Sequence, residues 1–392
     1  MRRVAFLLLI GGVAGAGDAP VLAKVVPPAA RVSVEEAVRT AVDFLVRNQN
    51  KDGSFGRSTI GRNYELWCDV PGGHQAFKGG TTALCWLGLH DAPYQPEASK
   101  QAQARCLQWL VKNAAVKRAY GEQFYNIWPY AYGIRALACA LKEPASADAT
   151  AGAPGASREE IVATIQQILK GLDTLQTADG GWSYLDFDAP LRKPTSSNSF
   201  TTATVLVGLH EARAKGVEVP QKMIDKAVKY LWRNRTPQGN YWYSIGWQWR
   251  PHGQINLAQG SSMRNQSCNL ALHLFDPEKL GRDGMRLGLE QLRDNHRFAT
   301  AALRRPQPHS SWYAVSGYFY LYGYQYAALV LERLPEEDRR EFWPFVAESI
   351  LKTRQPDGSF WDYPTYDYHK YYGTGYALIA LSRCPPGPPS SG

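Results

Sequence analysis

One short turn recurs along the chain and constrains its fold more than any other feature. It reads Gln49-Asn-Lys-Asp-Gly-Ser-Phe-Gly56 near the start, Gln176-Thr-Ala-Asp-Gly-Gly-Trp182 in the middle and Gln355-Pro-Asp-Gly-Ser-Phe-Trp361 near the end. A blurred copy stands at Arg235-Thr-Pro-Gln-Gly-Asn-Tyr-Trp242. Self-similarity of this kind indicates a repeat architecture, in which each copy is one supersecondary unit.

Each copy lies between two kinds of helical pattern. Segments with apolar residues at helical spacing alternate with segments that are apolar nearly all round, and a helix of the second kind belongs inside a large core. Ser33 with Glu36 and Ser157 with Glu160 have the spacing of capping boxes. The predicted amphipathic helices are 32–48, 98–113, 161–175, 221–234, 284–295 and 336–354, and the predicted apolar helices are 82–89, 130–141, 202–212, 265–275, 322–334 and 374–382.

The apolar segments also share a register. Thr82, Thr202 and Thr374 each stand at the same distance before a Gly/Ala-Leu pair, while the fourth copy, at Asn265, is degraded. Small residues let helices pack closely around a common axis. The sequence therefore predicts an all-α fold, an (α/α)6 toroid of six helical hairpins with apolar helices inside and amphipathic helices outside. An open superhelix of helix pairs is the alternative; the matching turns at both ends favour closure.

Composition narrows the class of protein. The 392 residues are 44% hydrophobic, which is enough for a sizeable core, and a closed repeat array of this length can be one domain. The formal net charge is +9, but no Lys/Arg-rich run is present, so we expect no nucleic-acid partner.

The two ends differ from the repeat region. Arg2 and Arg3, an apolar stretch and small residues up to Ala23 are typical of a secretory signal, so we expect residues 1–23 to be removed from a secreted or periplasmic protein. N-terminal sequencing of exported material tests this expectation. Residues 32–383 are expected to form the toroid, and residues 384–392 a disordered Pro/Ser/Gly tail.

The six cysteines lack CxxC spacing, and Cys85, Cys106, Cys139 and Cys268 fall inside apolar helical patterns. We expect buried thiols there rather than a disulfide framework. No HExxH or paired-His spacing is present, so the sequence predicts no metal site and implies no cofactor.

The turn resembles the QW repeat of the squalene–hopene cyclases, lanosterol-type cyclases and protein prenyltransferase β subunits. The resemblance covers residues 33–383 and is clearest at Gln49 with Phe55 and at Gln176 with Trp182. It implies that the glutamines, Gln355 included, tie the end of one outer helix to the neighbouring repeat. It also implies an isoprenoid-like ligand, although a motif of this kind specifies fold better than activity.

The groups that perform the family's chemistry are missing. A protonating triterpene cyclase needs a DxDD segment, and the matching position near residues 198–201 holds no carboxylate. No DDxxD segment exists for diphosphate chemistry, and the Asp/Cys half of the prenyltransferase zinc site has no counterpart. Protein prenylation is therefore excluded by this comparison of motifs.

The long loops all lead into the N-terminal ends of the apolar helices, which in a toroid share one opening. Helix N-termini favour anionic groups, and aromatic residues are dense on these loops, which indicates a binding cavity or a plug. Titratable loop residues, among them His309 and Asp362, are candidates for acid–base chemistry. The predicted catalytic residues are Asp186, Asp188, Asp367 and His369, and the predicted ligand-binding residues are Trp67, Trp128, Tyr184, Arg250, Arg264, Trp312, Tyr313, Tyr371 and Tyr372.

Three functions follow from this pattern. The first is an exported, cyclase-like toroid that binds a hydrophobic, isoprenoid-like ligand. The aromatic faces of the protein would stabilise cationic intermediates. The second is a carbohydrate-active toroid, as in polysaccharide lyases, acting on an acidic glycan. The third is a non-catalytic binding or scaffold protein of the cell envelope, which predicts an opening without convergent carboxylates or histidines. The sequence leaves open whether the chain is an enzyme; the expected partner is a hydrophobic small molecule or a glycan, with peripheral contact to a membrane.

Overall fold

The computed structural model describes residues 32–58, 70–118, 123–141, 154–187, 191–249 and 253–385. The predicted signal segment 1–23 and residues 386–392 of the predicted tail lie outside the described residues, as do Trp67, Asp188 and Arg250. The chain divides after Arg31, and the unit that begins at Val32 contains all the helices described below.

Two sets of six helices alternate along this unit. The outer, amphipathic helices are α1 (Val34–Asn48), α3 (Glu97–Asn113), α5 (Arg158–Leu175), α7 (Gln221–Asn234), α9 (Arg282–Asp294) and α12 (Glu336–Leu351). The inner, largely buried helices are α2 (Gly73–Asp91), α4 (Ile127–Cys139), α6 (Ser199–Ala214), α8 (Ala258–Phe275), α11 (Phe319–Leu331) and α13 (Tyr368–Leu381).

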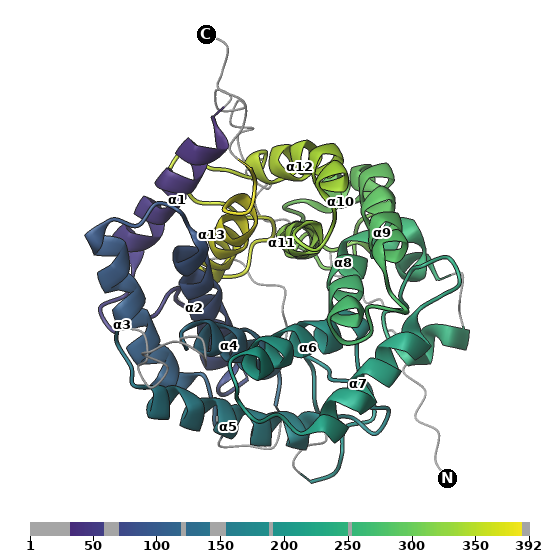
Figure 1. Ribbon diagram of the computed structural model, residues 1–392, viewed down its shortest axis with the longest axis horizontal. Helices are drawn as coiled ribbons and strands as arrows, with labels where there is room; N and C mark the ends of the chain where they lie inside the picture. The colour runs from purple at the N-terminus through teal and green to yellow at the C-terminus, as the bar shows by residue number, and fades with distance from the viewer. Residues whose placement is uncertain are drawn as a thin grey trace, which may run out of the picture. The chain divides into compact units, whose positions relative to one another are not determined.

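The inner helices form a closed ring (Figure 1). Each packs on the next in the order α2, α4, α6, α8, α11 and α13, and α13 returns to pack on α2. The ring also closes outside, where α12 contacts α1. The predicted (α/α)6 toroid is therefore confirmed, and the open superhelix is not observed.

Short elements fill the connections. They are the helix α10 (His296–Ala302) and the 3₁₀ turns η1 (Ile245–Trp249), η2 (Gln254–Asn256) and η3 (Trp312–Ala314). Among the described residues there is no strand, only isolated bridges, of which Trp182 to Asn198 is one.

The capping signals start two outer helices as expected. Ser157 and Glu160 form a complete capping box at α5. Ser33 accepts a hydrogen bond from the Glu36 amide at α1, whereas the Glu36 carboxylate pairs with Arg39.

Each repeated turn joins three helices. In the second copy the Gln176 side-chain amide donates to the carbonyl oxygens of Gly180, at 3.0 Å, and of Met223 on α7, at 2.9 Å. The Trp182 amide donates to Thr202 Oγ1 on α6 at 2.9 Å. The turn therefore ties the end of α5 to the next outer helix and to its own inner helix.

The other copies repeat this arrangement with one correction. Gln49 donates to Gly53 and to Ala102 on α3, and the Phe55 and Phe360 amides donate to Thr82 and Thr374. Gln355, however, donates back to Thr353 and reaches no neighbouring helix. It stands three residues before the turn glycine instead of four, so Arg354 occupies the bridging position and donates to Thr40 on α1.

Several inner helices begin earlier than the sequence predicts. Helix α2 starts at Gly73 rather than near residue 82, through a glycine-rich stretch that reads as loop. A Cβ on Gly79 would lie 2.8 Å from the Cβ of Pro129, and one on Gly80 would lie 3.1 Å from that of Trp128. These glycines therefore serve close packing of α2 on α4, where a larger side chain would push the helices apart.

Replacing Gln176 with leucine tests the turn. The change leaves two carbonyl oxygens without their side-chain donor, so we expect the free energy of unfolding to fall by about 2–4 kcal/mol. Urea titration followed by circular dichroism measures it. Gln101→Leu on the exposed face of α3 is the matched control, with a change within about 0.5 kcal/mol. Equal effects of the two substitutions would contradict the bridging role.

Candidate functional site

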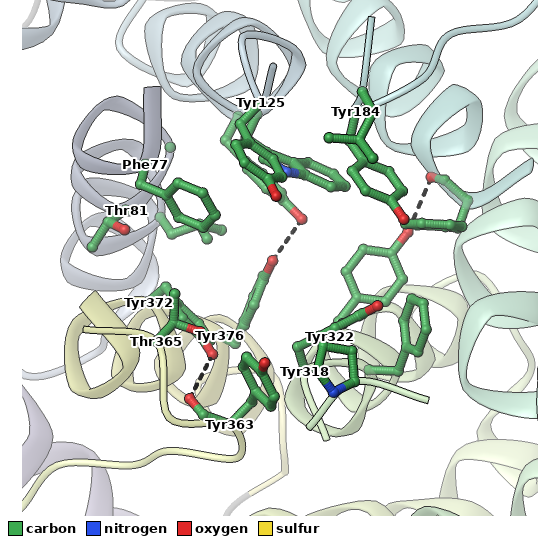
Figure 2. Close-up of a pocket in the computed structure, with 18 of the residues that line it drawn as sticks. Phe77, Thr81, Tyr125, Tyr184, Tyr318, Tyr322, Tyr363, Thr365, Tyr372 and Tyr376 are labelled. Atoms are coloured by element: carbon green, nitrogen blue, oxygen red, sulfur yellow. Dashed lines mark hydrogen bonds between the residues drawn. The ribbon is translucent and has the colours of Figure 1, made fainter. Parts of the chain in front are cut away.

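A cavity of about 280 Å³ lies where the loops from the outer helices enter the N-terminal ends of the inner helices. We call this end of the ring the mouth. Twelve of the nineteen lining residues are aromatic, and none is Asp, Glu, Lys or Arg (Figure 2). The lining residues are Phe77, Gly80, Thr81, Leu84, Tyr125, Trp128, Tyr132, Tyr184, Leu185, Phe200, Pro308, His309, Tyr318, Phe319, Tyr322, Tyr363, Thr365, Tyr372 and Tyr376.

The aromatic rings contact one another and form a continuous wall. Trp128 stacks on Tyr132 and on Tyr184, with ring centroids 6.2 Å apart in each pair. Phe200 meets Phe319 edge to face at 5.1 Å. Such a wall offers an apolar surface whose π faces also attract a cation.

Tyrosine hydroxyls supply the polar points of the cavity. The Tyr132 and Tyr376 hydroxyls lie 2.7 Å apart, and Tyr322 donates to the Phe200 carbonyl at 3.1 Å (Figure 2). Burial holds the pKa of Tyr132, Tyr322 and Tyr376 well above the ordinary value for a phenol. These groups therefore stay neutral and act as hydrogen-bonding groups.

His309 is the one imidazole in this lining. Its Nδ1 lies 2.8 Å from the Ala314 carbonyl oxygen, so Nδ1 carries the proton and Nε2 accepts from the Tyr318 hydroxyl at 3.0 Å. Burial lowers the pKa of His309, and the charge of Arg264 lowers it further. The ring is therefore held neutral near pH 7.

A buried carboxyl stands behind the lining, next to α11 and α13. Asp362 is fully buried, and its Oδ2 accepts from the Leu321 amide in the first turn of α11 at 2.8 Å. Its Oδ1 lies 3.2 Å from the Tyr372 hydroxyl, which also lies 3.1 Å from the Tyr363 carbonyl oxygen. Burial raises the pKa of Asp362 to about 7 in spite of these hydrogen bonds. Asp362 thus fixes Tyr372 and the start of α11 at the cavity.

Backbone strain concentrates on the loops of the mouth. Among the described residues other than glycine, the positive φ angles belong to Tyr125, Arg304, His309, Tyr313, Ala314 and Tyr366. All six lie on loops that lead into inner helices, and Tyr125 and His309 line the cavity. Strained conformations of this kind cost about 1–3 kcal/mol each and cluster at functional sites.

The predicted ligand-binding residues divide into two groups. Trp128, Tyr184 and Tyr372 line the cavity, and Arg264 lies behind the lining against Phe319. The other three described residues lie elsewhere. Trp312 is 71% exposed, Tyr313 packs on Phe298, and Tyr371 packs on Phe44 and Phe55.

The three predicted acid groups that the structure describes, Asp186, Asp367 and His369, are not among the lining residues. Asp186 is buried, and its carbonyl oxygen accepts from the Gln123 amide. His369 contacts the Tyr366 carbonyl oxygen at 2.6 Å and packs on Trp361, and burial lowers its pKa. Asp367 is half-buried and precedes α13, and burial raises its pKa. Their catalytic role stays a prediction. Those that the structure describes do not share a wall of this cavity.

Helix geometry explains which of these residues reach the cavity. Because α13 begins at Tyr368, the predicted loop residues His369, Tyr371 and Tyr372 stand on its first turns. Tyr372 and Tyr376 are four residues apart and share the face toward the cavity, while His369 and Tyr371 point elsewhere. Phe200, Phe319, Tyr322 and Tyr376 were absent from the predicted site because apolar helices read as core. Aromatic pairing at i and i+3 or i+4, as in Phe319 with Tyr322 and Tyr372 with Tyr376, could have found three of them, whereas Phe200 has no such partner.

The described residues contain no group of three or more His, Cys, Asp and Glu placed to hold a metal ion. Five described cysteines are free thiols, with Cys85, Cys106 and Cys268 buried. No described helix combines the length and the apolar composition that a membrane crossing needs.

No family model and no curated protein matches the sequence. Solved structures do share the fold. The type II terpene cyclase MstE from Scytonema is similar over 89% of this chain and 97% of its own, with a TM-score of 0.52 and 13% identity.

Two carbohydrate-active proteins are similar at the same level. The α-1,6-mannanase GH76A of Salegentibacter sp. HEL1_6 covers 89% of this chain and 99% of its own, with a TM-score of 0.57 and 13% identity. The unsaturated glucuronyl hydrolase from Bacillus sp. GL1 covers 89% and 96%, with a TM-score of 0.54 and 12% identity. At such identities the likeness establishes the α/α toroid fold and nothing about chemistry.

The raised pKa of Asp362 makes a pH-dependent prediction. Well below pH 3.8 the carboxyl is protonated in the folded and the unfolded chain. Between pH 3.8, the ordinary pKa of the carboxyl, and pH 7, its approximate pKa in the folded chain, only the unfolded state loses the proton. The stability that the neutral buried carboxyl contributes is therefore lost as the pH rises across that window. Asp362→Asn cannot ionise. We expect the free energy of unfolding of the wild type, relative to the variant, to fall by up to about 4 kcal/mol over this range.

Urea titrations of both proteins at several pH values measure the difference. Other groups titrate in the same range, but they cancel when the two proteins are compared at each pH. Parallel profiles for wild type and Asp362→Asn would contradict the burial of an uncharged carboxyl.

Proposed function

We propose that this protein binds a hydrophobic, isoprenoid-like molecule in the aromatic cavity at the mouth of the toroid. The observation that carries the proposal is the lining itself, in which aromatic rings predominate and no side chain of Asp, Glu, Lys or Arg takes part. An apolar ligand gains free energy from every part of its surface that such a wall removes from water.

The same lining separates the three functions that the sequence allowed. Hydrolysis of a glycosidic bond uses a pair of carboxylates across the bond, and recognition of an acidic glycan uses several cations. Neither set is found among the described lining residues. The proposal therefore concerns binding and assigns no reaction.

Binding is tested with farnesol, an isoprenoid alcohol, by equilibrium dialysis. We expect a dissociation constant on the order of 10 µM for a ligand of this size. Thr365 lines the cavity (Figure 2), and Thr365→Trp should fill part of it and weaken binding at least about 10-fold. Thr174→Trp adds the same side chain on the exposed surface of α5 and should leave binding unchanged.

Circular dichroism of both variants verifies that the fold survives. Failure of the wild type to bind farnesol and longer isoprenoid alcohols would refute the proposed function. Unchanged binding by a folded Thr365→Trp variant would place the ligand outside this cavity.

We also propose that the mouth contacts a membrane surface, from which an apolar ligand would enter. Loops of the mouth carry four large apolar side chains that water reaches: Phe187 is 59% exposed, Leu191 95%, Trp249 82% and Trp312 71%. Tryptophan favours the membrane–water interface. Basic residues are exposed nearby, which favours anionic lipid; they are Arg192, Lys193, Arg297, Arg304 and Arg305.

Sedimentation with phosphatidylglycerol-containing vesicles tests this contact. The double variant Trp249→Ser with Trp312→Ser should lower the bound fraction at least about 10-fold, because two exposed indoles no longer enter the interface. Tyr94→Ser, at the other end of α2, is the control. Equal binding of all three proteins, or no binding by the wild type, would refute membrane contact while leaving the cavity proposal intact.

A further inference from the structure

Arg264 on α8 is a buried charge without a counter-ion among the described residues. Its side chain is fully inaccessible to solvent. Nη2 donates to the carbonyl oxygen of Ile255 at 2.5 Å and lies 3.5 Å from that of Gly260, whereas Nε and Nη1 have no hydrogen-bond partner in the described structure. Two donor nitrogens without partners on a buried cation are costly, so this arrangement is incomplete as it stands.

The guanidinium lies one ring layer behind the cavity. Its Cζ is 5.6 Å from the ring centroid of Phe319, which lines the cavity, and 5.1 Å from that of Tyr243. The Tyr243 hydroxyl is 2.7 Å from the hydroxyl of Tyr184, another lining residue. Phe319 therefore contacts both the charge and the cavity, and Tyr243 links the charge to the lining residue Tyr184. The faces of both rings stabilise the cation.

No described lining group neutralises this positive charge. The lining holds no carboxylate, burial keeps the pKa of Tyr132 and Tyr322 high so that both stay neutral, and His309 is an uncharged imidazole. Asp362 is engaged by the Leu321 amide and the Tyr372 hydroxyl. The N-terminal ends of α4, α6, α11 and α13 add partial positive charges at the same end of the ring.

From these observations we infer that the ligand of the cavity carries a carboxylate, with Arg264 as the residue that selects for it and the aromatic wall holding the apolar body. The inference rests on the proposed function and narrows the proposed ligand to an amphipathic isoprenoid acid or a fatty acid. The head would lie on the side of Phe319 and Tyr318, and the unpartnered N–H groups would face the incoming charge.

The size of the expected preference follows from Coulomb's law. Two unit charges on the order of 8 Å apart, at an effective dielectric constant of about 20, attract strongly enough to change a dissociation constant roughly 30-fold. A ring that moves aside and permits direct contact would increase this factor.

The test compares farnesoic acid with farnesol, a matched pair that differs at the head, by equilibrium dialysis at pH 8. The wild type should bind the acid roughly 30-fold more tightly than the alcohol. Arg264→Met keeps much of the side-chain volume and removes the charge, so it should bind both molecules with the affinity of the alcohol. Arg264→Lys should restore much of the preference because it restores the charge.

A matched control and the wild type keep the inference falsifiable. Arg340 is 79% exposed on α12, and Arg340→Met should leave the preference unchanged. Equal affinity of the wild type for the two probes overturns the inference even if Arg264→Met fails to fold. A full preference in a folded Arg264→Met variant overturns it as well. If the alcohol binds and the acid has no advantage, only this inference fails; if neither binds, the proposed function fails and takes the inference with it.

Discussion

The hydrogen bonds of the repeated turn determine how one helical hairpin meets the next. In the second copy, a side-chain amide at the end of one outer helix reaches the following outer helix, and the backbone amide of the turn aromatic reaches a threonine on the inner helix. Gly180 adopts φ +104°, and a Cβ there would lie 2.6 Å from the Lys226 carbonyl oxygen on α7. Short polar contacts therefore fix the position and direction of the next hairpin, in addition to the apolar packing of the core.

The close approach of a turn glycine to the next outer helix also closes the ring. Gly358 follows α12, and a Cβ at this glycine would lie 2.5 Å from the Thr40 carbonyl oxygen on α1. The last turn thus meets the first helix as each earlier turn meets the next one. Closure sends every inner helix in one direction, so their N-terminal ends and the loops that precede them gather at a single mouth. A cavity with helix N-termini around it and aromatic rings on its wall is the consequence.

The sequence predicts this architecture well because each helical hairpin carries the same hydrophobic periodicity, so the evidence for one hairpin is strengthened by the others. Six apolar helices and six amphipathic ones follow from periodicity, and the turn appears in recognisable copies. Individual positions are harder. The stretch from Gly73 to Gly80 reads as loop although it is helix, because glycine permits both a turn and a close helix–helix contact. Gln355 matches the motif by type but is one residue out of register, and only the bridging geometry reveals Arg354 in its place.

The site itself could be predicted only in part, for a related reason. The sequence points to aromatic residues on loops, whereas eight of the twelve aromatic lining residues stand on inner helices, where Phe319 and Tyr376 look like ordinary core. Whether such a ring faces the core or a cavity depends on the rotation of its helix, which composition and periodicity do not encode. The loop candidates His369 and Tyr371 stand on the first turns of α13 and point away from the cavity, while Tyr372 points into it.

The degraded fourth repeat makes α8 the polar helix of the inner ring. Where three inner helices carry threonine, α8 carries Asn265, whose Oδ1 accepts from the Tyr241 amide at 3.3 Å, so the turn contact survives the substitution. The helix is otherwise rich in buried serine, asparagine and glutamine, and these groups make a polar side to an apolar ring. Arg264 is placed on that side, one ring layer from the cavity. A charge in this position is not balanced from within the described fold, and the cavity in front of it is where an anion from outside can approach.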